Sequence, residues 1–283
     1  MKLKISYEES KHWRHIQNKK VILTIYLVLR ILVVATMVAQ FFNRNYENVM
    51  LCVLTLVLFM LPSFCERRLH IDLPDTLEVI VLLFIFSAEI LGEIQEFYIL
   101  IPGWDTVLHT LNGFLCAAIG FSIVNILNED KHTSMHLSPF YMAVTAFCFS
   151  MTIGVLWEFF EWGMDNLVGL DMQKDTVLTG FNTVMLDPQG RNVAYHVRNV
   201  TDTILVFADG STMSMGLGGY LDIGLMDTMK DLLVNLIGAV VFSFFGYFYV
   251  KSKGKGKVAR NFIPNVLEHP VKDAENPEKT EEK

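Results

Sequence analysis

Residues 21–41, VILTIYLVLRILVVATMVAQF, decide the fold class of this 283-residue chain. The stretch holds one charged side chain, Arg30. An α-helix rises about 1.5 Å per residue, so about 20 apolar residues cross the roughly 30 Å hydrocarbon core of a bilayer. The run is too long for the apolar part of a secretory signal peptide, and no small-residue cleavage site follows it. It therefore predicts a retained signal anchor that crosses a membrane.

Five more apolar runs follow the first. They cover residues 49–64, 77–94, 104–127, 139–162 and 226–250, and the run at 77–94 is more amphipathic than the first two. The mean hydropathy of +0.37 does not decide the class by itself, because a soluble domain can be as apolar. The lengths of the runs predict an all-α membrane protein. We expect a six-transmembrane-helix bundle, with helices one to five in residues 21–162 and helix six in residues 226–250.

Lysine and arginine are concentrated on one side of the predicted membrane. Residues 1–20 are basic, Arg67 and Arg68 follow the second run, and a basic segment follows the last run. The positive-inside rule therefore places both termini in the cytoplasm. The expectation of a bacterial cytoplasmic (inner) membrane follows from the family resemblance given below. The acidic, proline-containing tail at 251–283 is expected to be disordered. The net charge of −7 shows no nucleic-acid signature, and membrane lipids are the expected partners.

Residues 163–225 form one long polar insert, which the same rule places on the outer side. Its sequence alternates as β-strands do, and two turn sequences interrupt the alternation. Asp187-Pro188-Gln189-Gly190 separates residues 183–186 from 192–197, and Asp209-Gly210 separates 203–208 from 211–215. We therefore predict an extracytoplasmic β-rich insert, a small meander of β-hairpins that covers the outer face of the bundle.

Four of the apolar runs carry acidic residues or histidine near one end, at spacings of three or four residues that share a helical face. Runs three and five are predicted to run outward and runs four and six inward, so all four sets should meet at the outer end of the bundle. The sets are Glu89, Glu93 and Glu96; Asp105, His109 and Asn112; Glu158, Glu161 and Asp165; and Asp227, Asp231 and Asn235.

Three of these side chains, His109, Glu158 and Asp231, lie about one turn inside the predicted interface. A carboxylate at membrane depth costs roughly 2.5–3.5 kcal/mol on insertion scales and usually faces a cavity or a partner. Glu158 and Glu161 also lie at a helix C-terminus, where the helix dipole disfavours an anion. Few fixed cations are available nearby, so the cluster needs a bound cation, a proton or water. This pattern predicts a functional cavity.

The candidate roles follow from side-chain chemistry. Carboxylates with one imidazole suit a divalent cation such as Mg, Mn, Ca or Zn, and an aspartate–histidine pair can instead act as a general base or a proton relay. The candidates are Asp105 and His109 as catalytic residues; Glu158, Glu161, Asp231 and Asp227 as metal ligands; and Arg30, Asn112, Asp165, Asp175 and Asn235 as substrate contacts.

Structural alternatives exist for several of these residues. Asp105 and Asp227 stand where a helix N-cap belongs, and an aspartate is common there in any case. Arg30, near the middle of the first run, could form an ion pair with an inward-facing carboxylate such as Glu89. It could equally recognise an anionic group such as a lipid phosphate, which guanidinium binds in a fork geometry. Both readings place its side chain inside the bundle.

Four blocks of sequence together resemble the YjdF-like family of bacterial multi-pass membrane proteins, which has no assigned activity. The blocks begin at Trp104-Asp105, Trp157-Glu158, Gln173 and Asp227-Thr228, and the resemblance covers roughly residues 75–250. The helices that carry His109 and Asn235 are also distantly similar to VanZ-like proteins, which are linked to glycopeptide resistance and the cell envelope. The stretch between Asp175 and Asp227 is longer here than in the simpler YjdF-like pattern. The resemblance implies that the acidic and histidine positions belong together.

Three functions fit the sequence. The first is a metal-dependent enzyme acting on a lipid-linked or cell-envelope substrate at the outer leaflet. The second is a non-catalytic envelope or sensor protein that binds a cation and uses its β-insert to bind a partner. The third is a cation- or proton-coupled transporter, which is disfavoured because the inner half of the bundle is almost free of ionisable groups and no inverted repeat is evident. The sequence leaves the choice between enzyme and binding protein open.

Overall fold

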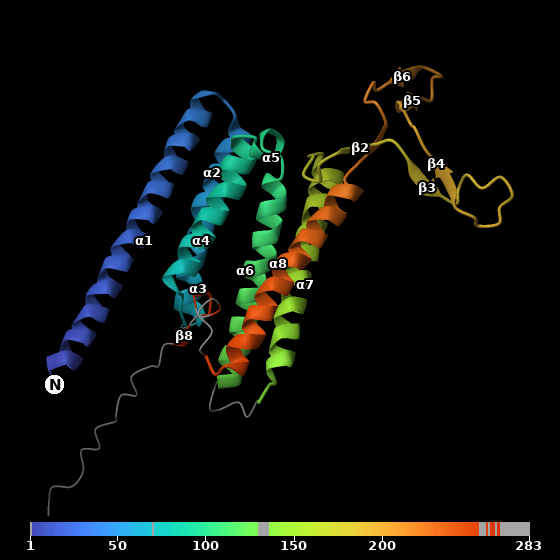
Figure 1. Cartoon of the computed structure of the whole chain (residues 1–283). Helices are drawn as coiled ribbons and strands as arrows, with labels where there is room; N and C mark the ends of the chain where they lie inside the picture. Colours follow the sequence, from blue (N-terminus) through green and yellow to red (C-terminus); the bar gives the residue numbers. More distant parts are fainter. Residues whose placement is uncertain are drawn as a thin grey trace, which may run out of the picture.

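The computed structural model describes residues 2–69, 71–129, 136–254, 259, 261–263 and 265–266, and most of the tail predicted to be disordered lies outside them. The described chain is mostly helical, as predicted (Figure 1). Five helical segments are long and apolar enough to cross a membrane: Lys20–Phe42, Tyr46–Phe64, Trp104–Asn128, Pro139–Val168 and Leu225–Lys251. They contain the helices α1 (Lys2–Phe42), α2 (Tyr46–Leu58), the start of α3 (Leu61–Leu69), α6 (Trp104–Glu129), α7 (Pro139–Gly163) with η2 (Met164–Val168), and α8 (Leu225–Lys251).

The third predicted span differs from the others. It is helical without a break, as α4 (Asp75–Phe86) followed by the π-helix η1 (Ser87–Ile94), and the short α5 (Phe97–Leu100) comes after it. Four carboxylates lie within α4 and η1, at Asp75, Glu78, Glu89 and Glu93. Every 18-residue stretch of this segment contains three of them, whereas each of the five helices above has a stretch of that length with at most two charged side chains. A count of six membrane-crossing helices therefore remains a prediction. The wide turns of η1 are of a kind that is frequent at functional sites.

The helices form two packed groups. One buried cluster lies among α6, α7 and α8 around Phe121 and Phe242, and a second lies among α1, α2, α4 and η1 around Phe59 and Leu82. Glycines allow the first group to pack tightly, as is common in membrane bundles. A Cβ at Gly113 would lie 2.0 Å from the Asn235 carbonyl oxygen, and a Cβ at Gly238 would lie 2.0 Å from that of Thr110. The backbones of α6 and α8 therefore touch at two levels.

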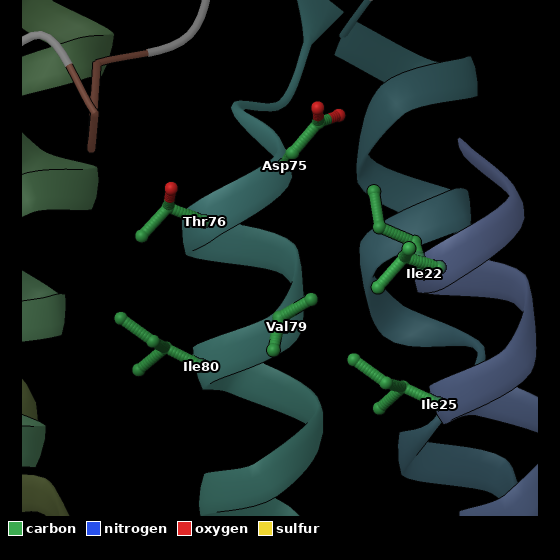
Figure 2. A pocket seen from close by; sticks show the side chains of 7 residues that line it. Ile22, Ile25, Asp75, Thr76, Val79 and Ile80 are labelled. Atoms are coloured by element: carbon green, nitrogen blue, oxygen red, sulfur yellow. The ribbon is translucent and has the colours of Figure 1, made fainter. Parts of the chain in front are cut away.

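A hollow of about 360 Å³ separates part of α1 from α4 (Figure 2). Its walls are mainly aliphatic, with two polar side chains contributed by the first turn of α4. The residues that line it are Val21, Ile22, Ile25, Asp75, Thr76, Val79 and Ile80. A hollow of about 440 Å³ also lies between α7 and α8, so each group of helices contains such a gap in its packing.

The insert contains three antiparallel strand pairs, and β1 (Ile71–Asp72) pairs with β8 (Asn265–Val266) elsewhere. Both predicted hairpins are present: β3 (Phe181–Thr183) pairs with β4 (Tyr195–Val197), and β5 (Ile204–Val206) pairs with β6 (Thr212–Ser214). The predicted meander is wrong. The first strand, β2 (Thr176–Leu178), pairs with the last, β7 (Tyr220–Asp222), and each pair is a separate two-stranded sheet. Figure 1 shows the two hairpins projecting beyond this ladder to one side of the bundle.

Candidate cation-binding site

The first two turns of α6 carry an aspartate–histidine pair. Asp105 and His109 are four residues apart and share one helical face, which brings Asp105 Oδ1 to 3.3 Å from His109 Nε2. On the other side of the imidazole ring, His109 Nδ1 lies 3.9 Å from Oε1 of Glu158 on α7. The imidazole is therefore held between carboxylates from two helices, as the sequence suggested.

Helix α8 adds Asp231, which is 1% exposed. One ligand atom from each of Asp105, His109 and Asp231 lies within 4.8 Å of the others. Within the described part of the chain, Asp231 Oδ1 and Glu158 Oε2 are buried without a hydrogen-bond partner. An ionised oxygen buried without a donor is costly, so these two atoms favour a proton or a cation between the helices.

Lys230 provides one positive charge at the edge of the cluster. Its Nζ lies 3.2 Å from Asp105 Oδ2, 3.8 Å from Asp231 Oδ1 and 3.9 Å from Asp227 Oδ1. With Glu158 and Glu161 the cluster has five carboxylates against Lys230 and, when protonated, His109. Negative charge is therefore in excess even when both basic side chains are charged. The charge balance of the site is completed only by protons or by an external cation.

Glu161 lies at the rim of the cluster. It is 8% exposed, and its Oε1 accepts a hydrogen bond of 2.8 Å from the Trp157 indole N–H. Trp157 comes one turn before Glu161 on α7 and is partly exposed on the outside of the bundle. One oxygen of Glu161 is thus committed to that indole, which leaves the other available to a ligand.

Asn112 and Asn235 lie one turn deeper than the carboxylates. Asn112 Nδ2 donates to Asn235 Oδ1 over 3.3 Å, and Asn235 is 1% exposed. A Cβ at Gly154 of α7 would lie 2.7 Å from Asn235 Nδ2, so the amide fills the space above that glycine. The two asparagines bind each other across α6 and α8 and form the floor of the site. Their assignment as substrate contacts remains a prediction.

Asp165 and Asp227 hold a short strap, residues 172–174, against the site. The Asp165 carboxylate accepts hydrogen bonds from the backbone N–H groups of Met172 and Gln173, over 2.5 and 2.8 Å. The next backbone N–H, that of Lys174, donates to Asp227 Oδ2 over 2.9 Å. Gln173 Nε2 also donates to Thr228 Oγ1 over 2.5 Å. The strap therefore fixes the start of the insert to the first turn of α8.

Neither Asp227 nor Asp105 is the N-cap residue of its helix, which was the structural alternative for both. The N-cap residue of α8 is Gly224, with φ 99°, and the backbone N–H of Met226 donates to Asp222 Oδ2 over 2.8 Å. Asp227 thus belongs to the first turn, and its carboxylate faces Lys174 and Lys230. The two oxygens of Asp105 face His109 and Lys230. Asp222 is a helix-start acceptor that the sequence analysis did not single out.

Two predicted substrate contacts lie apart from this cluster. Asp175 is exposed in the insert, where desolvation and then the negative charges of Asp171, Asp165 and Asp222 raise its pKa. Arg30 is on α1 in the other group of helices. Its guanidinium lies 4.2 Å from the centre of the Tyr26 ring and donates to the Tyr26 hydroxyl over 2.5 Å.

Among the residues that the structure describes, no carboxylate forms an ion pair with Arg30, so the proposed pair with Glu89 is not formed.

Tyr98 of α5, which the sequence analysis did not single out, lies near the site. Its ring packs on Gly92 of η1, where a Cβ would lie 2.3 Å from Tyr98 Cε2. Burial raises the pKa of Tyr98, and the negative charges of Glu93, Asp105, Glu89 and Glu161 raise it further. The η1 carboxylates and the α6–α7–α8 cluster therefore act on one phenol. The spacing Gly92-x₅-Tyr98 gave no signal for this contact.

A family model matches residues 25–252. The chain belongs to DUF2238, a family of predicted membrane proteins. The match covers the whole cluster and nearly all of the five helices that are long and apolar enough to cross a membrane. No curated protein and no solved structure matches the sequence. Membership of DUF2238 supports a membrane protein and assigns no activity to it, so a function has to be argued from the geometry of the cluster.

Proposed function

We propose that this membrane protein binds one divalent cation at Asp105, His109 and Asp231, and that the cation serves a reaction on a lipid-linked or cell-envelope substrate. The observation that carries the proposal is the approach of three ligand atoms to within 4.8 Å of one another. Buried Glu158, with one oxygen lacking a donor among the described residues, supplies a fourth candidate ligand beside them. Carboxylate oxygens suit Mg, Ca or Mn, and the imidazole favours Zn or Mn.

The Asp105–His109 contact favours an enzyme over a passive binding protein. A carboxylate at one ring nitrogen fixes the orientation and tautomer of an imidazole, which is what a general base or a metal ligand needs. A bound cation would polarise an oxygen of the substrate or lower the pKa of a bound water. Glu161 and Asp227 are further candidate ligands at the rim. The distant resemblance to VanZ-like proteins, which are linked to the cell envelope, favours an envelope substrate.

The proposal includes six membrane-crossing segments, with α4 and η1 as the third, cytoplasmic termini and the cluster on the outer side of the inner membrane. It is supported by the basic flanks of the predicted spans. A cysteine placed at exposed Ser211 in a cysteine-free background should react with an impermeant thiol reagent added to intact cells. Reaction only after permeabilisation would reverse the orientation.

Elemental analysis of the purified protein tests the cation. We expect close to one equivalent of a divalent metal in the unmodified protein, and much less in His109→Ala and Glu158→Gln. Arg30→Met is the matched control, because Arg30 lies on α1 outside the cluster. Equal, negligible metal in all four proteins, including after incubation with Mn²⁺ or Zn²⁺, would overturn the proposal.

A second candidate function is a non-catalytic cation-binding protein whose insert binds a partner. The two hairpins favour it, because their strands expose apolar side chains such as Ile204 and Val206 to solvent. Transport fits less well, because residues 110–128, 139–157 and 232–250 contain no Asp, Glu, Lys, Arg or His. Cation flux in proteoliposomes that is lost in Asp231→Asn would favour transport instead.

A further inference from the structure

Lys230 already occupies the carboxylates that the proposed cation needs. Its Nζ lies 3.2 Å from Asp105 Oδ2 and 3.8 Å from Asp231 Oδ1, and both aspartates belong to the candidate ligand group. The third partner, Asp227 Oδ1 at 3.9 Å, is not in that group. The ammonium thus neutralises two of the three candidate ligands when no other cation is present.

We propose that Lys230 is a tethered competitor for the site, so that a divalent cation binds only by displacing its ammonium group. The inference rests on the proposed function. An ion held by atoms of Asp105, His109 and Asp231 would lie within a few ångströms of the present position of Nζ. Like charges at such a distance repel strongly, more so near a protein than in bulk water. The two cations therefore exclude each other.

The surroundings of Lys230 allow its displacement. The Lys230 side chain is 48% exposed, whereas that of Asp231 is 2% exposed, so the lysine is the partner that is free to move. Its four-carbon stem is flexible. Asp227, three residues earlier on α8 and closer to the start of the helix, can keep the ammonium after Asp105 and Asp231 release it. Asp227 is itself held in place by the Lys174 backbone N–H.

Competition of this kind sets the cation concentration to which the site responds. Binding has to supply the free energy of breaking the Lys230 contacts, so the affinity is lower than the ligand set alone would give. The same displacement exposes a primary amine at the end of the bundle that carries the insert. Occupancy of the site is therefore coupled to the position of a charged side chain that substrates or partners can meet.

Mn²⁺ titration of the purified full-length protein tests the competition. We expect Lys230→Met to bind Mn²⁺ at least about tenfold more tightly than the unmodified protein, because the repelling charge is gone. Lys230→Arg keeps the charge and should stay within about threefold of the unmodified protein. Equal or weaker binding by Lys230→Met would overturn the competition and leave the proposed function standing.

Two other outcomes separate the two proposals. Binding by Lys230→Met alone would support the competition and overturn a cation-dependent function of the natural protein. No binding by any variant would overturn both.

Amine labelling of the unmodified protein gives a readout that needs no substitution. An acylating reagent should modify Lys230 faster when Mn²⁺ is present, because the ammonium is then released from its carboxylates. Lys251, at the other end of α8, is the matched control and should label at the same rate with and without Mn²⁺. Unchanged or slower labelling of Lys230 at Mn²⁺ concentrations that fill the site would overturn the displacement.

Discussion

Asp187 in the insert and Asp231 in the helical cluster differ in how their carboxylate oxygens are hydrogen-bonded. In the insert, Asp187 accepts hydrogen bonds from the backbone N–H groups of Gln189, Arg191 and Val193, and its side chain is in solvent. In the bundle, Asp231 is buried and its Oδ1 has no hydrogen-bond donor among the described residues. The contrast separates an aspartate whose oxygens are satisfied by a turn from one with a buried oxygen that receives no hydrogen bond from the described residues.

The largest effect should come from disturbing the helix contact beneath the cluster. Gly113→Leu places a side chain where even a Cβ would lie 2.0 Å from the Asn235 carbonyl oxygen. Overpacking typically costs about 1–3 kcal/mol and more where the obstacle is backbone, so we expect about 3 kcal/mol or more of lost stability. Thermal unfolding in detergent measures it.

Gly163→Ala is the control for that substitution, because a Cβ at Gly163 meets nothing within 4 Å. Equal unfolding temperatures for the two variants would mean that the close approach of α6 and α8 is not needed. The hairpins of the insert should be unaffected by either change, which would confine the glycine requirement to the bundle.

A second test replaces one aspartate from each region with asparagine. Asp231→Asn removes a buried charge and should weaken Mn²⁺ binding by about 100-fold, a loss at the upper end of those known for groups that support a metal site. Its thermal stability should be equal or higher, since neutralising an incompletely paired buried charge is often favourable. Asp187→Asn should leave Mn²⁺ binding unchanged. A similar loss of binding in both variants would erase the distinction between the two regions.

The smallest effect is a pH dependence confined to the insert. Backbone hydrogen bonds lower the pKa of Asp187, and the Ser214 hydroxyl and the Gly216 N–H do the same for Asp202. Because the pKa is lower in the folded state, the ionised aspartate stabilises the folded insert at pH values above the ordinary aspartate pKa of about 3.9. This stabilisation is lost as the pH falls through the pKa of the folded state. Hydrogen-exchange protection of the Gln189 and Val193 amides, corrected for intrinsic rate, should therefore fall below about pH 4.

Asp187→Ala should show the low protection at every pH, and exchange in α8 should not follow the same titration. Protection that is independent of pH in the unmodified protein would show that the Asp187 hydrogen bonds do not hold the turn.

The sequence correctly predicted the features that depend on a local pattern of residues. Hydropathy located five membrane-crossing helices, and Asp209-Gly210 marked the hairpin of β5 and β6. The four-residue spacing of Asp105 and His109 placed both on one face, and alternating helix direction brought Glu158 and Asp231 to them. Each of these features depends on residues close in the chain or on a simple rule of threading.

What could not be predicted depends on long-range contacts and on the direction of individual side chains. Asp165 has the same spacing from Glu161 as Glu161 has from Trp157, yet Asp165 turns to the strap. The pairing of β2 with β7 joins segments far apart in the chain, so no local sequence pattern predicts it. Lys230 contacts carboxylates from two helices, and its contact with Asp105 of α6 joins residues far apart in the chain.

The β2–β7 ladder also makes the insert removable in principle. Leu178 and Tyr220 face each other across an antiparallel pair, so a two-residue turn could join them directly and close the chain without residues 179–219. The strap, Asp222 and every helix in the described part of the chain would remain covalently unchanged by such a deletion. The hairpins therefore form a module that protein engineers could delete or exchange for another one.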